Sequence, residues 1–115
     1  MKQPGLIETC RRLIAEQLPS RYPTIGYTAC GLHISVRTLQ RQLRVRGFVY
    51  EDLVEGVRRE VACRLLQELD ASIADAARAA GYTDPSSFSR AFRRWTHMSP
   101  RAYRQRLRLQ ANPRS

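Results

Sequence analysis

The sequence has almost no lysine and few acidic residues. Of its 115 residues, 20 are basic and 10 are acidic, and Lys2 is the one lysine, so arginine carries the net charge of +10. A surplus of this size favours a polyanionic partner such as nucleic acid. Arginine suits bidentate contacts to phosphate and guanine better than lysine does, although codon bias in a GC-rich genome explains the choice of arginine equally well.

Signatures of disulfides, metal sites and membrane segments are also missing. The three cysteines, Cys10, Cys30 and Cys63, are widely spaced, and no cluster of cysteine and histidine has zinc-site spacing. We interpret them as reduced core residues and expect neither a metal nor a cofactor. No segment approaches the ~20 apolar residues that span a bilayer, and no apolar signal segment is present, so the sequence predicts a cytoplasmic protein without membrane contact.

Apolar residues recur with helical spacing along the chain, and proline and glycine fall between the periodic segments. The pattern predicts an all-α protein of one compact domain with seven helices. The predicted helices cover about 6–18, a short segment after Thr24, 36–45, 50–69, a segment after Ser72, 85–95 and 101–110. Residues 111–115 are expected to fray.

Start and stop residues support these helix boundaries. Ser35 and Ser72 are good N-caps, and Asp84 followed by proline satisfies two start rules of a helix at once. Gly47 and Gly81 are well placed to end the helices that precede them, because glycine adopts the left-handed conformation easily.

Two segments of the chain repeat the same apolar spacing. The aligned pairs are Ile25 with Ile73, Ala29 with Ala77, Leu39 with Phe88, and Leu43 with Phe92, with one more residue in the second turn. A short helix with a small residue in mid-face lets a second helix cross it closely, as in a helix-turn-helix. The sequence therefore predicts a duplicated helix-turn-helix, with lobe one at about 6–47, a linker helix at about 50–69 and lobe two at about 72–110.

Six motifs complete this pattern. They are SVRTLQRQL at 35–43, GF at 47–48, RREVACRLL at 58–66, IADAA at 73–77, GYTDPSSFSRAFRRW at 81–95 and SPRAYR at 99–104. Together they closely resemble the DNA-binding domain of AraC/XylS-type transcription regulators. The resemblance implies a two-lobe, homeodomain-like domain that reads a promoter site in double-stranded DNA, with RNA polymerase as a second candidate partner. His33 departs from the pattern because the family usually has glycine there, and implies modest turn strain.

The predicted helix 36–45 turns its two leucines inward, which leaves the opposite face for DNA. Arg37, Gln40 and Arg41 on that face are the predicted base readers. Arginine bridges guanine O6 and N7, and glutamine bridges adenine N6 and N7. The base-contacting positions that the resemblance implies coincide with these three. For Arg44 and Arg46, a solvated or phosphate-binding side chain is favoured over base reading.

The predicted helix 85–95 turns its two phenylalanines inward and leaves Ser86 and Arg90 as base readers. Serine reaches a base edge only if the helix seats deeply and otherwise binds phosphate, so half of this readout is expected to be weak. The predicted phosphate-contacting residues are Ser35, Thr38, Arg44, Ser87, Ser89, Arg93 and Arg104. For Arg104, as for Arg58, an ion pair or a cap within the fold is an equal alternative. Trp95 and Tyr103 are interpreted as core residues.

Two other functions stay open. An enzyme is disfavoured, because no nucleophile with a base, carboxylate pair, metal cluster or phosphate-cradling loop has workable spacing. A basic helical protein that binds nucleic acid without sequence preference fits the charge but not the duplicated unit.

The 115 residues contain no room for an effector domain, so the chain is either a fragment of a longer regulator or a regulator that stands alone. Two reading units in one chain predict that the isolated module binds as a monomer.

Overall fold

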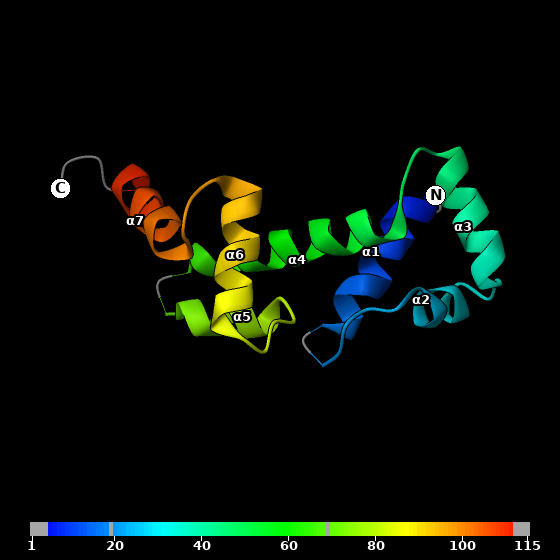
Figure 1. Ribbon diagram of the computed structural model, residues 1–115, viewed down its shortest axis with the longest axis horizontal. Helices are drawn as coiled ribbons and strands as arrows, with labels where there is room; N and C mark the ends of the chain where they lie inside the picture. The colour runs from blue at the N-terminus through cyan, green and yellow to red at the C-terminus, as the bar shows by residue number, and fades with distance from the viewer. Residues whose placement is uncertain (1–4, 19, 69, 112–115) are drawn as a thin grey trace. The chain divides into compact units, whose positions relative to one another are not determined.

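The computed structural model describes residues 5–18, 20–68 and 70–111, and in this range it contains seven helices and no strand (Figure 1). The helices are α1 (Leu6–Gln17), α2 (Ile25–Gly31), α3 (Val36–Val45), α4 (Tyr50–Leu66), α5 (Ile73–Ala79), α6 (Pro85–Thr96) and α7 (Pro100–Ala111). The predicted all-α class and the predicted helix order are confirmed. The chain divides into two compact units, 1–58 and 59–115, and the boundary lies within α4.

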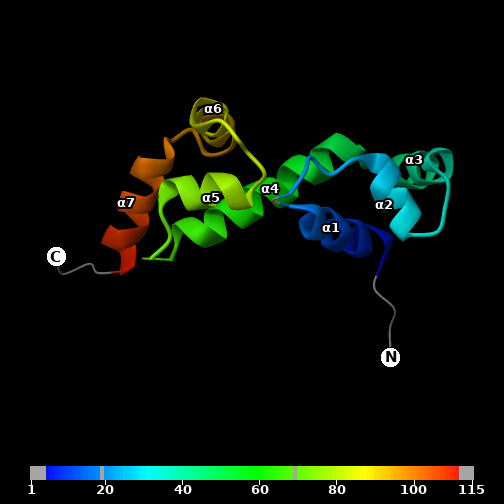
Figure 2. The ribbon, with the colours of Figure 1, turned by 90° about the horizontal axis from the view of Figure 1, so that it is seen from below.

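The first unit contains α1, α2, α3 and the beginning of α4. The short α2 lies against both α1 and α3 (Figures 1 and 2). Ala29 of α2 and both leucines of α3, Leu39 and Leu43, are buried, as the periodicity predicts. From α1, Cys10 and Ile14 are fully buried in the same unit.

A buried chain of hydrogen bonds joins α1, α2 and the start of α4. Gln17 Nε2 donates to Thr28 Oγ1 at 3.0 Å, and Thr28 Oγ1 lies 2.8 Å from the Tyr50 hydroxyl. That hydroxyl lies 3.0 Å from the carbonyl oxygen of Pro23 and 3.1 Å from that of Thr24. Carbonyl oxygens only accept, so the single Tyr50 proton is shared between them, and Thr28 must donate to Tyr50. The direction of the whole relay is therefore fixed.

Burial keeps this relay in one protonation state. Removal from water raises the pKa of the Tyr50 hydroxyl, so tyrosine stays neutral. Gln17 is only 4% exposed, and its Oε1 is buried without a hydrogen-bond partner among the described residues. The cost of that unpaired oxygen is offset by the bonds that the Gln17 amide donates.

Both helix-turn-helix turns are closed by the same pair of backbone hydrogen bonds. These run from Ile34 N to Ala29 O, His33 N to Cys30 O, Tyr82 N to Ala77 O and Gly81 N to Arg78 O, at 2.9 to 3.1 Å. This is the Schellman arrangement, which requires one left-handed residue just after the helix. His33 has a φ of 61° and Gly81 a φ of 91°, so the histidine occupies the position that favours glycine. The extra residue predicted in the second turn is confirmed by the helix bounds.

The second unit packs the end of α4, α5, α6 and α7 around an apolar core, with α5 lying against α4 (Figures 1 and 2). The buried core residues are Ala62, Leu66, Ala76, Ala77, Ala80, Phe88 and Phe92. Trp95 and Tyr103 pack against this core, which confirms their predicted place. Edge-to-face ring contacts join Phe92 to Tyr103 at 5.1 Å and to Trp95 at 6.0 Å between centroids.

The long helix α4 ends at Leu66, three residues before the predicted end. The guanidinium of Arg104 donates to the carbonyl oxygens of Leu66 at 3.1 Å and of Leu65 and Glu68 at 3.3 Å. The last carbonyls of a helix lack the partners that its interior carbonyls have. Here Leu65 O also accepts from Glu68 N at 3.0 Å, and the arginine from α7 adds donors in place of a further helical turn. Leu69 lies outside the described residues.

Two smaller predictions also need correction. Cys10 is buried and Cys63 is half-buried, but Cys30 is exposed, so the expectation of three core cysteines is wrong for Cys30. Successive residues lie about 100° apart around a helix, so Ala29 takes the inward position and Cys30 does not. Ala111 closes α7 instead of fraying, whereas 112–115 lie outside the described residues.

Replacing Tyr50 by phenylalanine should lower the free energy of unfolding by about 1–3 kcal/mol, because the Thr28 hydroxyl and the Pro23 carbonyl lose their partner. Tyr27→Phe is the matched control, since Tyr27 is 53% exposed and its ring keeps the contact with Arg21. A change within about 0.5 kcal/mol is expected for the control. Urea denaturation followed by circular dichroism measures both, and equal losses in the two variants would contradict the relay.

Candidate nucleic-acid interface

The outer face of α3 gathers the residues predicted to read bases in the first unit. Val36, Arg37, Gln40, Arg41 and Arg44 line one open hollow on the surface of this helix, and all five are exposed. No acidic residue occurs in α3. None of these five side chains forms a hydrogen bond or ion pair within the described part of the chain, so the donors of the three arginines and of Gln40 are available to a ligand.

The start of α3 determines which hydroxyl can serve a phosphate. Ser35 caps the helix, as predicted, because its Oγ accepts from Thr38 N at 3.0 Å. The Ser35 hydroxyl also donates its proton to Thr38 Oγ1 at 2.9 Å. A phosphate oxygen accepts hydrogen bonds and therefore needs a donor. The hydroxyl proton of Thr38 is still available for such a bond, whereas the hydroxyl proton of Ser35 is donated to Thr38.

At the start of α6, a carboxylate caps the helix and also accepts a hydroxyl proton. Asp84 accepts from Ser87 Oγ at 2.9 Å, from Ser87 N at 3.2 Å and from Ser86 N at 3.4 Å. The hydrogen bonds from the Ser87 hydroxyl and backbone hold the pKa of Asp84 below its usual value. Asp84 is therefore the N-cap of α6, as predicted. Ser86 and Arg90 lie four residues apart on one face of α6, and both are exposed.

Further along α6, Arg93 is exposed and Ser89 is half-buried. The helix contains no acidic residue in its first turn and ends at the left-handed residue His97, which has a φ of 61°. The structure therefore exposes Ser86, Arg90 and Arg93 on α6, leaves Ser87 and Ser89 half-buried, and buries the two phenylalanines.

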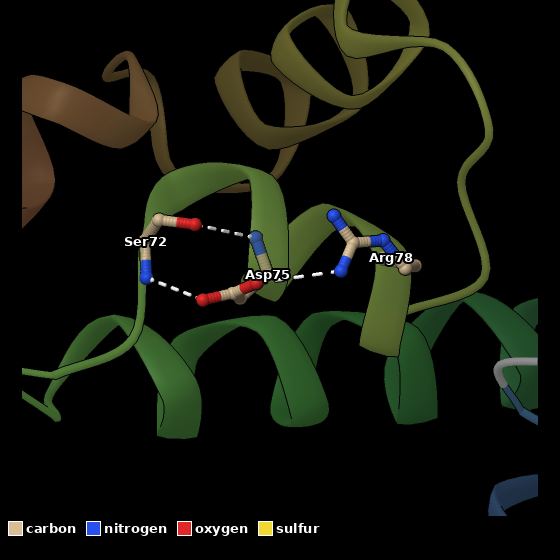
Figure 3. Close-up of polar contacts among 3 residues, drawn as sticks. All are labelled: Ser72, Asp75 and Arg78. Atoms are coloured by element: carbon tan, nitrogen blue, oxygen red, sulfur yellow. Dashed lines mark hydrogen bonds and ion pairs between the residues drawn. The ribbon is translucent and has the colours of Figure 1, made fainter.

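A capping box fixes the start of α5, the first helix of the second helix-turn-helix (Figure 3). The Ser72 hydroxyl accepts from Asp75 N at 3.0 Å, and the Asp75 carboxylate accepts from Ser72 N at 2.9 Å. The second of these bonds is the main reason why the pKa of Asp75 is lowered. Arg78 adds an exposed contact to Asp75 at 3.4 Å. Ser72 was predicted as the cap, and the three-residue spacing to an acidic residue is the signal that identifies Asp75 as its partner.

Three other arginines make contacts within the fold. The Arg58 guanidinium lies 5.5 Å from the ring centroid of Tyr22, and Arg46 donates to Gln42 Oε1 at 2.6 Å. Arg104 caps the end of α4, which is one of the two alternatives that its sequence position leaves open. Phosphate binding by Arg104 stays a prediction.

Within the described residues, none of the helices has the length and apolar character needed to cross a bilayer. In the same residues, no group of three or more histidine, cysteine, aspartate or glutamate side chains could hold a metal ion.

Known proteins share both the sequence pattern and the fold. A family model described as a helix-turn-helix domain matches residues 29–106. The ornithine utilization regulator of Pseudomonas aeruginosa is 35% identical over 103 residues, which cover 90% of this chain and 30% of that protein. The regulator VirS of Mycobacterium tuberculosis is 40% identical over 87 residues, which cover 76% of this chain and 26% of that protein. The chain thus spans less than a third of the length of these relatives.

Solved structures agree with this result. A DNA-binding transcriptional dual regulator from Escherichia coli K-12 superposes with a TM-score of 0.86 at 26% identity, covering 94% of this chain and 96% of that one. The C-terminal domain of AraT, a response regulator from Geobacillus stearothermophilus, gives 0.73 at 26% identity, covering 91% and 88%. Fold and matches define a domain with two helix-turn-helix units, of the class found in DNA-binding transcription regulators. The chain belongs to the AraC-type helix-turn-helix family.

The lowered pKa of Asp75 predicts a pH-dependent stability. Its pKa in the folded protein lies below the ordinary 3.8, so the carboxylate stabilises the fold above that pH and this stabilisation is lost as the pH falls through the folded pKa. Asp75→Ala should therefore be less stable than the wild type at pH 6, and the difference should shrink below about pH 4. Urea denaturation across this range tests it. Arg78→Ala, which removes only the exposed ion pair, is the control, and a pH-independent deficit in Asp75→Ala would refute the capping role.

Proposed function

We propose that this chain binds double-stranded DNA with sequence preference, using α3 and α6 as recognition helices in successive major-groove segments. The observation that carries the proposal is the outer face of α3. Arg37, Gln40 and Arg41 lie exposed, and without side-chain partners among the residues that the structure describes, on the second helix of a closed helix-turn-helix. In such units this helix presents its outer face to base edges.

The chemistry of these side chains suits base recognition. Arg37 and Arg41 each supply a planar fork that matches O6 and N7 of guanine, and Gln40 matches N6 and N7 of adenine. Each well-formed pair contributes about 1–3 kcal/mol of discrimination against the wrong base. In the second unit, Arg90 is the proposed guanine reader and the shorter Ser86 reads a base edge only at close approach.

Phosphate contacts then hold each recognition helix in register. Thr38, Arg44, Ser89 and Arg93 are the proposed donors, because their polar hydrogens are not committed to a cap. The hydroxyl protons of Ser35 and Ser87 and the guanidinium of Arg104 are bound within the fold. We therefore assign these three to helix capping, and any phosphate contact that they make is secondary.

The proposed target is a promoter site, because the similar proteins are named as transcription regulators. Two recognition helices in one chain supply two boxes of sequence, so the module needs no dimer to read its site. RNA polymerase is the proposed further partner, and the cytoplasm is the proposed location. Non-specific binding through the charge of +10 is the competing function.

Selection of bound duplexes from a random library, at near-physiological salt, separates the two functions. The proposal expects enrichment of an asymmetric site with two short, different boxes. Binding without any enriched sequence, fading as salt rises, would overturn the proposal and leave a non-specific nucleic-acid-binding protein.

Two substitutions assign the boxes to their helices. Arg41→Ala should relax base preference in one box and Arg90→Ala in the other, each at a cost of about 1–3 kcal/mol on the preferred duplex. Arg46→Ala removes the same charge from an arginine that is bound to Gln42, so it should leave base preference unchanged. The measurement is repeated duplex selection with each variant. Uniform weakening by Arg41→Ala, with the same preferred sequence, would refute its role as a base reader.

A further inference from the structure

The last helix, α7, carries positive charge without compensation. Between Pro100 and Ala111 it contains four arginines, Arg101, Arg104, Arg106 and Arg108, and no acidic residue. Arg101, Arg104 and Arg108 lie on one face, where they line a shallow surface hollow together with Gln105 and Ile73. No acidic residue lines this hollow, so like charges gather there at an electrostatic cost that an anion would relieve.

Arg104 holds this face in place. Its guanidinium donates to three carbonyl oxygens at the end of α4, as described above, and thereby ties α7 to the rest of the second unit. Arg101 and Arg108 are exposed and have no hydrogen bond or ion pair within the described residues. They lie seven residues apart on the helix, which is about 10.5 Å along its axis. This equals roughly three base-pair steps of a duplex, so each guanidinium can meet a phosphate of its own.

The hollow on α7 adjoins the proposed DNA-binding side of the second unit. Ile73 at the start of α5 lines both this hollow and the groove between α5 and α6. That groove is also lined by Arg78 of α5 and by Ser89 of α6, a proposed phosphate contact. In a helix-turn-helix the first helix crosses the DNA backbone, and α5 is that helix here. The basic face of α7 thus continues the surface along which a DNA strand would pass.

We propose that Arg101 and Arg108 bind phosphates of the DNA backbone beyond the recognition helix, which makes α7 an additional DNA-binding element of the second unit. The inference rests on the proposed function, because it needs the same duplex. It assigns to α7 a contribution to DNA affinity that does not depend on the base sequence. This contribution adds electrostatic attraction between the second unit and the DNA backbone, which the short serines of α6 do not supply. Arg104 acts as a positioning residue in this arrangement.

The salt dependence of binding tests this assignment. Each phosphate contact that is lost makes the slope of log K against log salt concentration shallower by about 0.9 on duplex DNA. Arg101→Ala and Arg108→Ala should each reduce the slope by about this amount, and the double variant by about 1.8. The losses should be the same on a selected duplex and on an unrelated one, and the selected sequence should not change.

Arg106→Ala is the matched control, because it removes an equal charge from the same helix on the opposite face, where Arg106 Nη1 contacts Met98 Sδ at 3.9 Å. We expect its slope to equal that of the wild type. Fluorescence anisotropy with labelled duplexes over a salt series gives the slopes, and circular dichroism verifies that each variant is folded.

Slopes for Arg101→Ala and Arg108→Ala that equal the control slope would overturn the inference. Sequence selection by the wild type would be unaffected by that result. If the wild-type chain binds no duplex at all, the proposed function itself fails, which is a different and separately visible outcome.

Discussion

Everything that the recognition helices present to solvent depends on a close crossing of two helices in each unit. The crossing is possible because Ala29 and Ala77, only 2% and 7% exposed, put nothing larger than a methyl group between the helices. A larger side chain would force the second helix outward, since well-packed interiors tolerate added volume poorly. The Schellman turns then fix the direction in which that second helix leaves. Because the two leucines of α3 are buried, the polar side chains on its opposite face are exposed.

The two units share this crossing but stabilise it with different chemistry. The first unit places Thr28 at the buried position that corresponds to Ala76 in the second, and builds a directed hydrogen-bond relay on its hydroxyl. The second unit fills its core with tilted and edge-to-face aromatic rings around Phe92. Hydrogen bonds demand defined partner atoms, whereas ring packing accepts small shifts at modest cost. The two units therefore share a backbone arrangement although different interactions stabilise their cores.

The sequence predicts the helix boundaries well because local chemistry sets most of them. Ser35, Ser72 and Asp84 act through atoms two or three residues away, and Gly81 acts through its own backbone. The outward positions of Arg37 and Arg41 follow equally from the inward position of the leucines.

Contacts between distant residues leave no such periodic signal. The Tyr50 hydroxyl meets Thr28, 22 residues away, and Arg104 ends a helix that lies 38 residues earlier in the chain. Neither of these two contacts can be derived from the spacing of residues in the sequence. The contact of Arg104 with the end of α4 is the one that makes this helix shorter than predicted. Cys30 is a different case. Cysteine is most often buried, but the spacing that turns Ala29 inward already places Cys30 on the outer face of α2.

The helix α4 belongs to both units, since Leu53, Val54 and Val57 are buried in the first and Ala62 and Leu66 in the second. Starting a helix is the unfavourable step in its formation, and each further residue adds a hydrogen bond at little additional cost. Once either unit has formed its part of α4, the other can extend an existing helix instead of nucleating a new one. The shared helix is thus a folding template, through which order in one unit promotes order in the next.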